Sequence, residues 1–182
     1  MTFEPMFSVP FYHYEIENWS DVKKNLKNVI GDLDERHLSS DKKVYSDFFT
    51  QMGSDSLPSY YPNVLEVIKP YLVDFFSIGD HVGNSVQCTD MWYQETLKGQ
   101  EHGIHNHGSI GWSSIIYFDF NPKVHQATKF FAPFNNYYTG NMISVSPIVE
   151  EGNMVIFPSS IAHVGPVNES DEKRSVISFN LR

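Results

Sequence analysis

Residues 102–118 read HGIHNHGSIGWSSIIYF, and this stretch carries the strongest signal for both fold and function. Three histidines, His102, His105 and His107, precede an apolar run that begins at Trp112. Alternate residues of an extended strand point the same way, so His105 and His107 can present two imidazoles to one point. His102 need not join them. The stretch therefore predicts a β-rich fold with a histidine-lined site.

Short β-type runs continue on both sides of this stretch, separated by Gly, Pro and Asn. We expect six strands, at Val86–Leu97, Ile110–Phe120, Thr128–Phe131, Met142–Val149, Met154–Phe157 and Arg174–Leu181.

The first half of the chain has a different sequence pattern, with two helices expected in it. An extended edge segment is expected over Phe3–Ile16, and a helix capped by Ser20 is expected to follow it. A second helix should run from about Pro62 to Phe76, after a long polar loop at residues 36–60. Two helices followed by many short strands predict an α+β fold, a β-sandwich or barrel-like jelly roll covered by N-terminal helices.

Size and composition exclude several classes of protein. The 182 residues suit one domain, 1–182, with 1–85 as helical support and edge strands and 86–182 as the jelly-roll core. With 13 basic against 22 acidic residues, a nucleic-acid partner is not expected. No apolar run approaches the ~18 residues of a membrane span, and the N-terminus lacks a signal peptide's pattern, so we expect a cytoplasmic protein without a membrane partner. Cys88, the only cysteine, forms neither an internal disulfide nor a thiolate zinc cluster.

A third imidazole for the site is available in FPSSIAHVGP, where His163 follows an apolar strand bracketed by Gly152 and Pro158. A turn there would direct His163 back into the fold. Imidazoles suit Zn, Cu, Fe and Ni, and a facial set of three ligands with open positions is typical of non-haem Fe(II) oxygenases. The usual set has two histidines and one carboxylate, so His107 removes a negative charge from the site. Histidines satisfied by ordinary hydrogen bonds are the alternative interpretation.

The second chemical signal is Arg174, which opens the apolar strand Arg174–Asn180. Positions 174, 176, 178 and 180 share a face, which places Arg174, Ser178 and Asn180 together. A buried guanidinium needs an anion, and its planar fork matches a carboxylate. The alternative is a strand-edge arginine paired with Glu172 or another surface acid.

These segments together resemble the Fe(II)/2-oxoglutarate-dependent oxygenase family. The resemblance rests on His105-x-His107, Trp112–Phe118, Glu151–Pro158, His163 and Arg174–Asn180. Trp92–Gly99 also resembles the family's strand before the metal pair, with Gln94 where Asn is common. The match covers most of residues 86–182 and the first 85 only loosely.

The resemblance implies a double-stranded β-helix that binds Fe(II) through His105, His107 and His163. It further implies that 2-oxoglutarate chelates the iron, with its far carboxylate held by Arg174 and Tyr117. The other residues expected at the co-substrate are Trp92, Gln94, Ser178 and Asn180. No catalytic residue is expected beyond the metal centre. With O2, such an enzyme hydroxylates a small-molecule or peptidyl substrate and releases succinate and CO2; a homodimer is one option for its assembly.

Further expectations concern the surroundings of the metal. Apolar side chains available to line it are Ile116, Phe118, Phe157 and Val176, and the loops at 36–60 and 132–141 are the expected lid. Because imidazole must be neutral to ligate, iron affinity is expected to fall below about pH 6.

A cupin is the rival interpretation of much the same residues. Gly99, His105 and His107 satisfy the cupin pattern Gly-x5-His-x-His, and Gly152, Pro158 and His163 satisfy its later part. However, the glutamate that cupins carry just beyond the pair is missing, since positions 111 and 112 are Gly and Trp. Arg174 separates the two interpretations, because a cupin has no stereotyped use for it. A purely structural jelly-roll or carbohydrate-binding module would leave these residues without a role.

Overall fold

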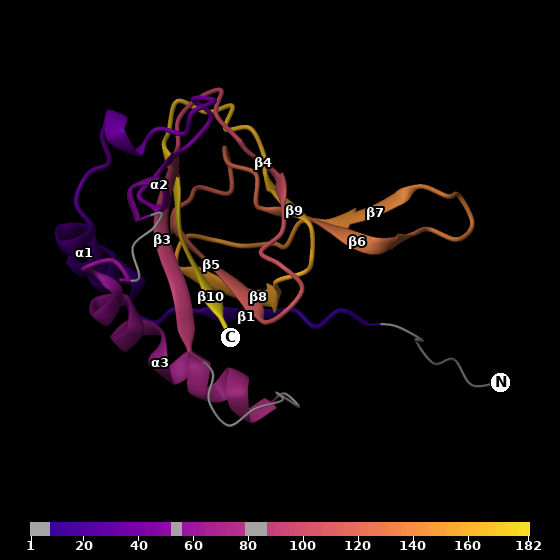
Figure 1. The fold of residues 1–182 in the computed structure, drawn as a ribbon, viewed down its shortest axis with the longest axis horizontal. Helices are drawn as coiled ribbons and strands as arrows, with labels where there is room; N and C mark the ends of the chain where they lie inside the picture. Colours follow the sequence, from indigo (N-terminus) through magenta and orange to yellow (C-terminus); the bar gives the residue numbers. More distant parts are fainter. Residues whose placement is uncertain (1–7, 52–55, 79–86) are drawn as a thin grey trace.

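Two antiparallel sheets form the body of the computed structural model, which describes residues 8–51, 56–78 and 87–182 (Figure 1). The larger sheet contains, in spatial order, β1 (Tyr12–Glu15), β8 (Asn153–Pro158), β5 (Trp112–Asp119), β10 (Arg174–Leu181), β3 (Cys88–Thr96) and β2 (Tyr45–Ser46). The smaller sheet contains β4 (His102–His105), β9 (His163–Gly165), β6 (Lys129–Asn135) and β7 (Met142–Val145). Sequence neighbours are rarely sheet neighbours, as in a jelly roll.

Helices cover one side of the larger sheet, whereas the β6–β7 hairpin projects from the other side of the molecule (Figure 1). The covering helices are α1 (Trp19–Ile30) and α3 (Tyr61–Ile78). The buried stripe of α3 is Val64, Ile68, Leu72 and Phe75, whose spacing is that of one helical face. Two short helices, η1 (Glu35–His37) and α2 (Phe48–Gln51), lie between α1 and α3 in the sequence.

The central strands are buried on both faces, which explains their continuous apolar runs. On β5, Ile116 and Phe118 pack against the helices. Ile115 and Tyr117 alternate with them and pack between the two sheets, where β6 contributes Phe130. The expectation that Ile116 and Phe118 line the metal was therefore wrong. Alternate residues of a strand face the same side, and both of these side chains face the helices.

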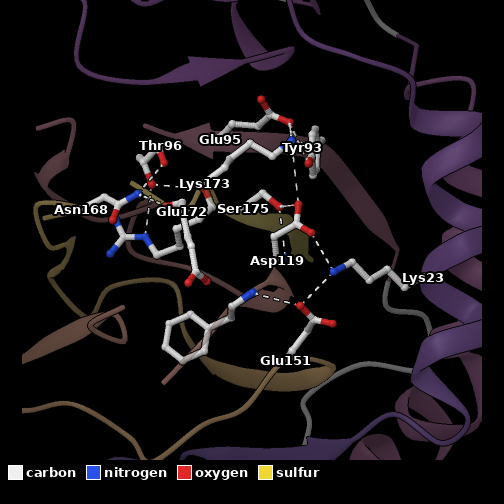
Figure 2. Close-up of polar contacts among 12 residues, drawn as sticks. Lys23, Tyr93, Glu95, Thr96, Asp119, Glu151, Asn168, Glu172, Lys173 and Ser175 are labelled. Atoms are coloured by element: carbon white, nitrogen blue, oxygen red, sulfur yellow. Dashed lines mark hydrogen bonds and ion pairs between the residues drawn. The ribbon is translucent and has the colours of Figure 1, made fainter. Parts of the chain in front are cut away.

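An ion-pair network ties α1 to the rim of the larger sheet (Figure 2). Lys23 Nζ lies 2.7 Å from Asp119 Oδ1 and 2.8 Å from Glu151 Oε2. Ser175 Oγ donates to Asp119 Oδ2 at 2.6 Å, which joins the network to β10. Lys173 continues the network through an ion pair with Glu95.

Several expectations about boundaries need correction. Ser20 does not cap the first helix: it lies inside α1, and Asn18 occupies the cap position. The stretch 36–60 is not one loop, since it holds most of η1 as well as β2 and α2. The strand expected at Met142–Val149 ends at Val145. Residues 1–7 and Val86, parts of two predicted extended segments, lie outside the described residues.

No helix within the described ranges is long and apolar enough to cross a membrane. The cytoplasmic location stays a prediction.

Gly152 is the contact point between the start of α1 and the turn before β8. Its φ of +87° lies in the left-handed region, and a Cβ there would stand 2.5 Å from Trp19 Cγ. Gly140, in the hairpin turn, has a similar φ of +70° but no atom within 4 Å of such a Cβ.

The two glycines allow a matched stability test. Gly152→Ala should lower the free energy of unfolding by about 1–3 kcal/mol more than Gly140→Ala, because only the first adds a packing clash to the backbone strain. Urea denaturation of both variants measures the difference. Equal losses would show that the Trp19 contact is not a constraint on the fold.

Candidate metal centre and its cavities

Three histidines from two segments of the chain converge between the sheets. His105 ends β4 and His163 begins β9, and the two are direct partners in the antiparallel pairing of these strands. His107 lies just beyond the end of β4, so His105 and His107 do not share one strand, contrary to the prediction from the sequence. One ligand atom from each imidazole lies within 4.8 Å of the other two.

Each of these imidazoles is fixed by a hydrogen bond at its Nδ1 atom. The acceptor is the Gly103 carbonyl for His105, at 2.7 Å, and the Ile161 carbonyl for His163, at 2.9 Å. For His107, Asn180 Oδ1 lies 2.7 Å from Nδ1. A bond of this kind fixes the tautomer and leaves Nε2 as the ligand atom, as in most metal-binding histidines.

The position of His107 depends on the larger sheet. Its backbone N–H donates to the Ser159 carbonyl at 2.9 Å, and Ser113 Oγ lies 2.9 Å from its Nδ1. Ser113 Oγ also donates to Asn180 Oδ1 at 2.9 Å. β5, β8 and β10 thus hold the third imidazole against the two that the smaller sheet supplies.

Burial is the main cause of the low basicity of these imidazoles. It lowers the pKa of His163 to about 3, with the neighbouring imidazole of His105 as the next cause. Burial also lowers the pKa values of His105 and His107. All three are neutral near pH 7, which is the form that binds a metal. Proton competition therefore begins at a lower pH than the onset near pH 6 expected from free histidine.

An inner cavity opens from the three imidazoles toward β10, and its polar end is Arg174, which is 6 % exposed. The guanidinium donates to Thr96 Oγ1 at 3.2 Å, the Gln126 carbonyl at 3.0 Å and the Pro166 carbonyl at 2.6 Å. Within the described ranges it forms no ion pair, and Glu172 is not its partner. Burial lowers the Arg174 pKa to about 10, and the guanidinium still carries its charge at neutral pH.

Tyr117 supplies an unpaired hydroxyl to the same cavity. Its side chain is 1 % exposed, and its hydroxyl is a buried polar atom with no hydrogen-bond partner among the described residues. Such orphaned groups are rare in folded proteins and call for a ligand or bound water. The cavity thus offers a positive charge and a free hydroxyl to an anion.

An outer cavity of about 340 Å³ lies on the other approach to the histidines. It shares its floor with the inner cavity through Trp92, Gln94, His102, His105 and His107. Its wall includes Phe48 and Phe49 of α2, within the stretch expected to act as a lid. The other expected lid, 132–141, belongs to the β6–β7 hairpin and does not line either cavity.

Most of the predicted co-substrate residues gather in the inner cavity: Trp92, Gln94, Tyr117, Arg174 and Ser178. Asn180 lies instead in the outer cavity, where it contacts His107. Val176 lines the inner cavity, and the Phe157 ring lies 5.0 Å from the His163 ring.

The sequence analysis missed several residues of the inner cavity. Thr96 and Thr128 line it, as does the Gln126 segment that accepts from Arg174. The spacing of Thr96 from Arg174 gave no signal, since only strand pairing brings them together. His102 stacks on His105 with 4.0 Å between ring centroids, but it is outside the convergent set of three.

A family profile described as "Putative 2OG-Fe(II) oxygenase" matches residues 90–180, half of the chain. No curated protein matches the chain in sequence.

Solved structures with the same fold cover nearly all of the chain. A prolyl-4-hydroxylase from Pseudomonas putida covers 96 % of this chain and 93 % of its own, with 12 % identity and a TM-score of 0.58. The viral collagen prolyl hydroxylase of Paramecium bursaria chlorella virus-1 covers 94 % of both chains, with 12 % identity and a TM-score of 0.60. HygX from Streptomyces hygroscopicus, solved with nickel and 2-oxoglutarate, covers 95 % of this chain and 82 % of its own, with 10 % identity and a TM-score of 0.64. The shared fold is the double-stranded β-helix.

The buried imidazoles make the stability of the metal-free protein depend on pH. Because the pKa of His163 falls from an ordinary value near 6.5 to about 3, the unfolded chain binds its proton first as the pH falls. The stability contributed by neutral His163 is thus complete above pH 6.5 and is lost as the pH falls toward 3.

Replacing His163 should weaken the dependence of the free energy of unfolding on pH. As the pH is lowered around pH 5, the free energy of unfolding of the wild type should fall more steeply than that of His163→Asn. The difference should be about 1.4 kcal/mol per pH unit, the slope that one bound proton gives. Urea denaturation between pH 4 and pH 7, with a chelator present, measures both slopes. Parallel profiles would mean that His163 titrates normally and is not buried as described.

Proposed function

The chain belongs to the 2OG-Fe(II) oxygenase family, and on that premise we propose which of its residues hold the iron and the co-substrate. His105, His107 and His163 bind Fe(II) through their Nε2 atoms. Arg174 and Tyr117 bind the far carboxylate of 2-oxoglutarate. The protein is an Fe(II)- and 2-oxoglutarate-dependent oxygenase, and it acts on a small molecule or a peptide.

The metal and co-substrate supply the oxidising chemistry: 2-oxoglutarate and O2 are consumed, one oxygen atom enters a C–H bond of the substrate, and succinate and CO2 leave. The protein's contribution is to bind, orient and exclude water. The three Nδ1 hydrogen bonds orient the imidazoles before any ligand arrives. Little reorganisation is then needed when the metal binds.

One observation carries the proposal: a buried guanidinium without an acidic partner lies in the cavity that opens from three convergent imidazoles. A carboxylate is the anion that its planar fork fits best. The free hydroxyl of Tyr117 provides a further donor to that carboxylate. A cupin would leave both groups without a use.

The remaining inner-cavity residues complete the co-substrate site. Gln94 and Ser178 offer an amide and a hydroxyl to the polar atoms of 2-oxoglutarate, while Trp92 packs against the ring of His107, with 5.3 Å between centroids. Ile115 and Val176 supply apolar walls that exclude water. Asn180 is a positioning residue, because it contacts the metal ligand His107.

The absence of nucleic-acid and membrane partners stays a prediction from the sequence, and the homodimer stays one option for the assembly.

Metal binding should require His105, His107 and His163 but not the neighbouring His102. Replacing His105, His107 or His163 with Ala should weaken Fe(II) or Mn(II) binding at least about 100-fold, because each removes one ligand atom. His102→Ala, the matched control in the same cluster, should retain the metal. Asn180→Ala should weaken it about 10–100-fold through loss of orientation.

Calorimetric titration of the metal-free variants under argon gives these affinities. Full metal retention by His107→Ala would show that His107 is not a ligand. Loss of the metal from His102→Ala would show that His102 is one.

Co-substrate binding should depend on the guanidinium of Arg174 and the hydroxyl of Tyr117. Arg174→Gln should weaken 2-oxoglutarate binding at least about 30-fold, equivalent to about 2 kcal/mol, and Arg174→Lys should recover only part of it. Tyr117→Phe should weaken binding about 3–10-fold, because it removes a hydrogen-bond donor to the carboxylate.

Binding is measured calorimetrically on protein saturated with Mn(II), with Arg36→Gln, an exposed arginine outside both cavities, as the control. Wild-type affinity in Arg174→Gln would place the carboxylate elsewhere and remove the basis of the proposal.

A further inference from the structure

The outer cavity leads to the same imidazoles without passing Arg174 or Tyr117. A ligand in it can therefore reach the metal centre while 2-oxoglutarate occupies the inner cavity. Its volume of about 340 Å³ lies at the small end of the range for small-molecule sites, roughly 300–1,000 Å³. The cavity suits the primary substrate of the enzyme, and its lining defines which chemistry it accepts.

One wall of the outer cavity is aromatic. Phe48 and Phe49 are 41 % and 37 % exposed, and the Phe48 ring meets that of Trp92 edge-on at 5.5 Å between centroids. The two phenyl rings project from α2, a helix of four residues. Exposed aromatic side chains gathered beside a cavity mark a contact surface for an apolar group.

Two opposite charges complete the lining. Asp90 and Arg182 are the only carboxylate and guanidinium among the described residues that line this cavity. Both lie beside His107. Asp90 Oδ2 accepts from Asn180 Nδ2, whose Oδ1 lies 2.7 Å from His107 Nδ1. Arg182 Nη2 donates to the His107 carbonyl at 3.0 Å. The charges therefore lie near the metal ligand, and their sum is zero. A phosphate-rich ligand gains nothing from such a balance, whereas a molecule with one charge of each sign does.

Both charged groups have free hydrogen-bonding capacity. Asp90 Oδ2 accepts from Thr89 Oγ1 at 2.7 Å and from Asn180 Nδ2 at 3.2 Å, while Oδ1 accepts from no described residue. Arg182 Nη2 donates to the His107 carbonyl at 3.0 Å, and its other side-chain nitrogen atoms bond to no group in the described ranges. The existing bonds hold each group in place, and the free atoms can bind a ligand.

We propose that the primary substrate is a small zwitterion with an apolar body, the chemistry of a free hydrophobic amino acid. Its ammonium group binds Asp90, its carboxylate binds Arg182, and its side chain lies along Phe48, Phe49 and Trp92. This assignment rests on the proposed function, since it places the substrate's C–H bonds beside the proposed metal ligands. A peptide, which has a neutral amide in place of each charge, could hydrogen-bond to Asp90 and Arg182 but would form no ion pair with either, so it would bind there more weakly.

The test uses protein loaded with nickel(II) and 2-oxoglutarate, whose affinities are measured first. L-leucine, L-methionine and L-phenylalanine are then titrated calorimetrically, together with their N-acetyl and C-terminal amide derivatives. At least one free amino acid should bind, and blocking either end should weaken binding at least about 10-fold, since each block removes a charged partner.

Combining variants with blocked ligands assigns each end. Asp90→Asn should weaken binding of the free amino acid at least about 10-fold and leave the residual affinity of its N-acetyl form unchanged within about two-fold. Arg182→Gln should behave in the same way toward the amide. Asp32→Asn and Arg36→Gln, which alter charges outside the cavity, are the matched controls and should have no effect.

Two results would overturn the substrate assignment while leaving the proposed function intact. In the first, nickel and 2-oxoglutarate bind but no free amino acid does. In the second, the doubly blocked form binds as well as the free one, which would indicate a peptide. If nickel and 2-oxoglutarate themselves do not bind, the proposed function fails, and the substrate assignment fails with it.

Discussion

The site depends on one electrostatic constraint: its inner cavity encloses a guanidinium and four imidazoles, and no carboxylate among the described residues lines it. Burying this set is tolerable only while the imidazoles are neutral, and burial itself lowers their pKa values accordingly. The same constraint leaves Arg174 as an uncompensated positive charge. The cavity is therefore suited to a metal at one end and to an anion at the other.

A histidine in place of a carboxylate at the proposed ligand position 107 fits this electrostatic arrangement. A divalent metal on three neutral ligands keeps its full charge, and Arg174 adds another, so a doubly charged co-substrate would offset most of the excess. In the usual set with one carboxylate ligand, the protein itself supplies part of that negative charge. Here the anion has to bring all of it, which should couple binding of the metal and of 2-oxoglutarate more tightly.

The fold supplies the rigidity that such a site needs. The larger sheet is covered by α1 and α3 on one face and packs against the smaller sheet on the other, so β5 and β10 are fixed from both sides. Tyr117 and Arg174 lie on these two strands, and His107 is held by their ends through Ser113 and Asn180. The exposed aromatic residues of the outer cavity instead come from α2, outside this rigid core. The proposed co-substrate site thus lies on the sheets, whereas the proposed substrate site also uses a short helix outside them.

Local patterns in the sequence predicted the parts that local chemistry determines. The bounds of β10 match the predicted strand Arg174–Leu181, because an apolar run buried on both faces has a strong signature. β9 was not predicted: three residues carry no periodicity, and only their pairing with β4 and β6 defines them. Other features depend on the pairing register of strands that are distant in the sequence. They are the faces of Ile116 and Phe118, the contact of Thr96 with Arg174, and the two separate cavities.

The most direct test of the account is the dependence of 2-oxoglutarate binding on the metal. Calorimetric titration of 2-oxoglutarate into metal-free and Mn(II)-loaded protein under argon compares the two affinities at constant pH. If one molecule contacts both Arg174 and the metal held by the three imidazoles, the loaded protein should bind it at least about 10-fold more tightly, with one molecule per chain. Equal affinities, or no binding to the loaded protein, would contradict the claim that the guanidinium and the imidazoles form a single site.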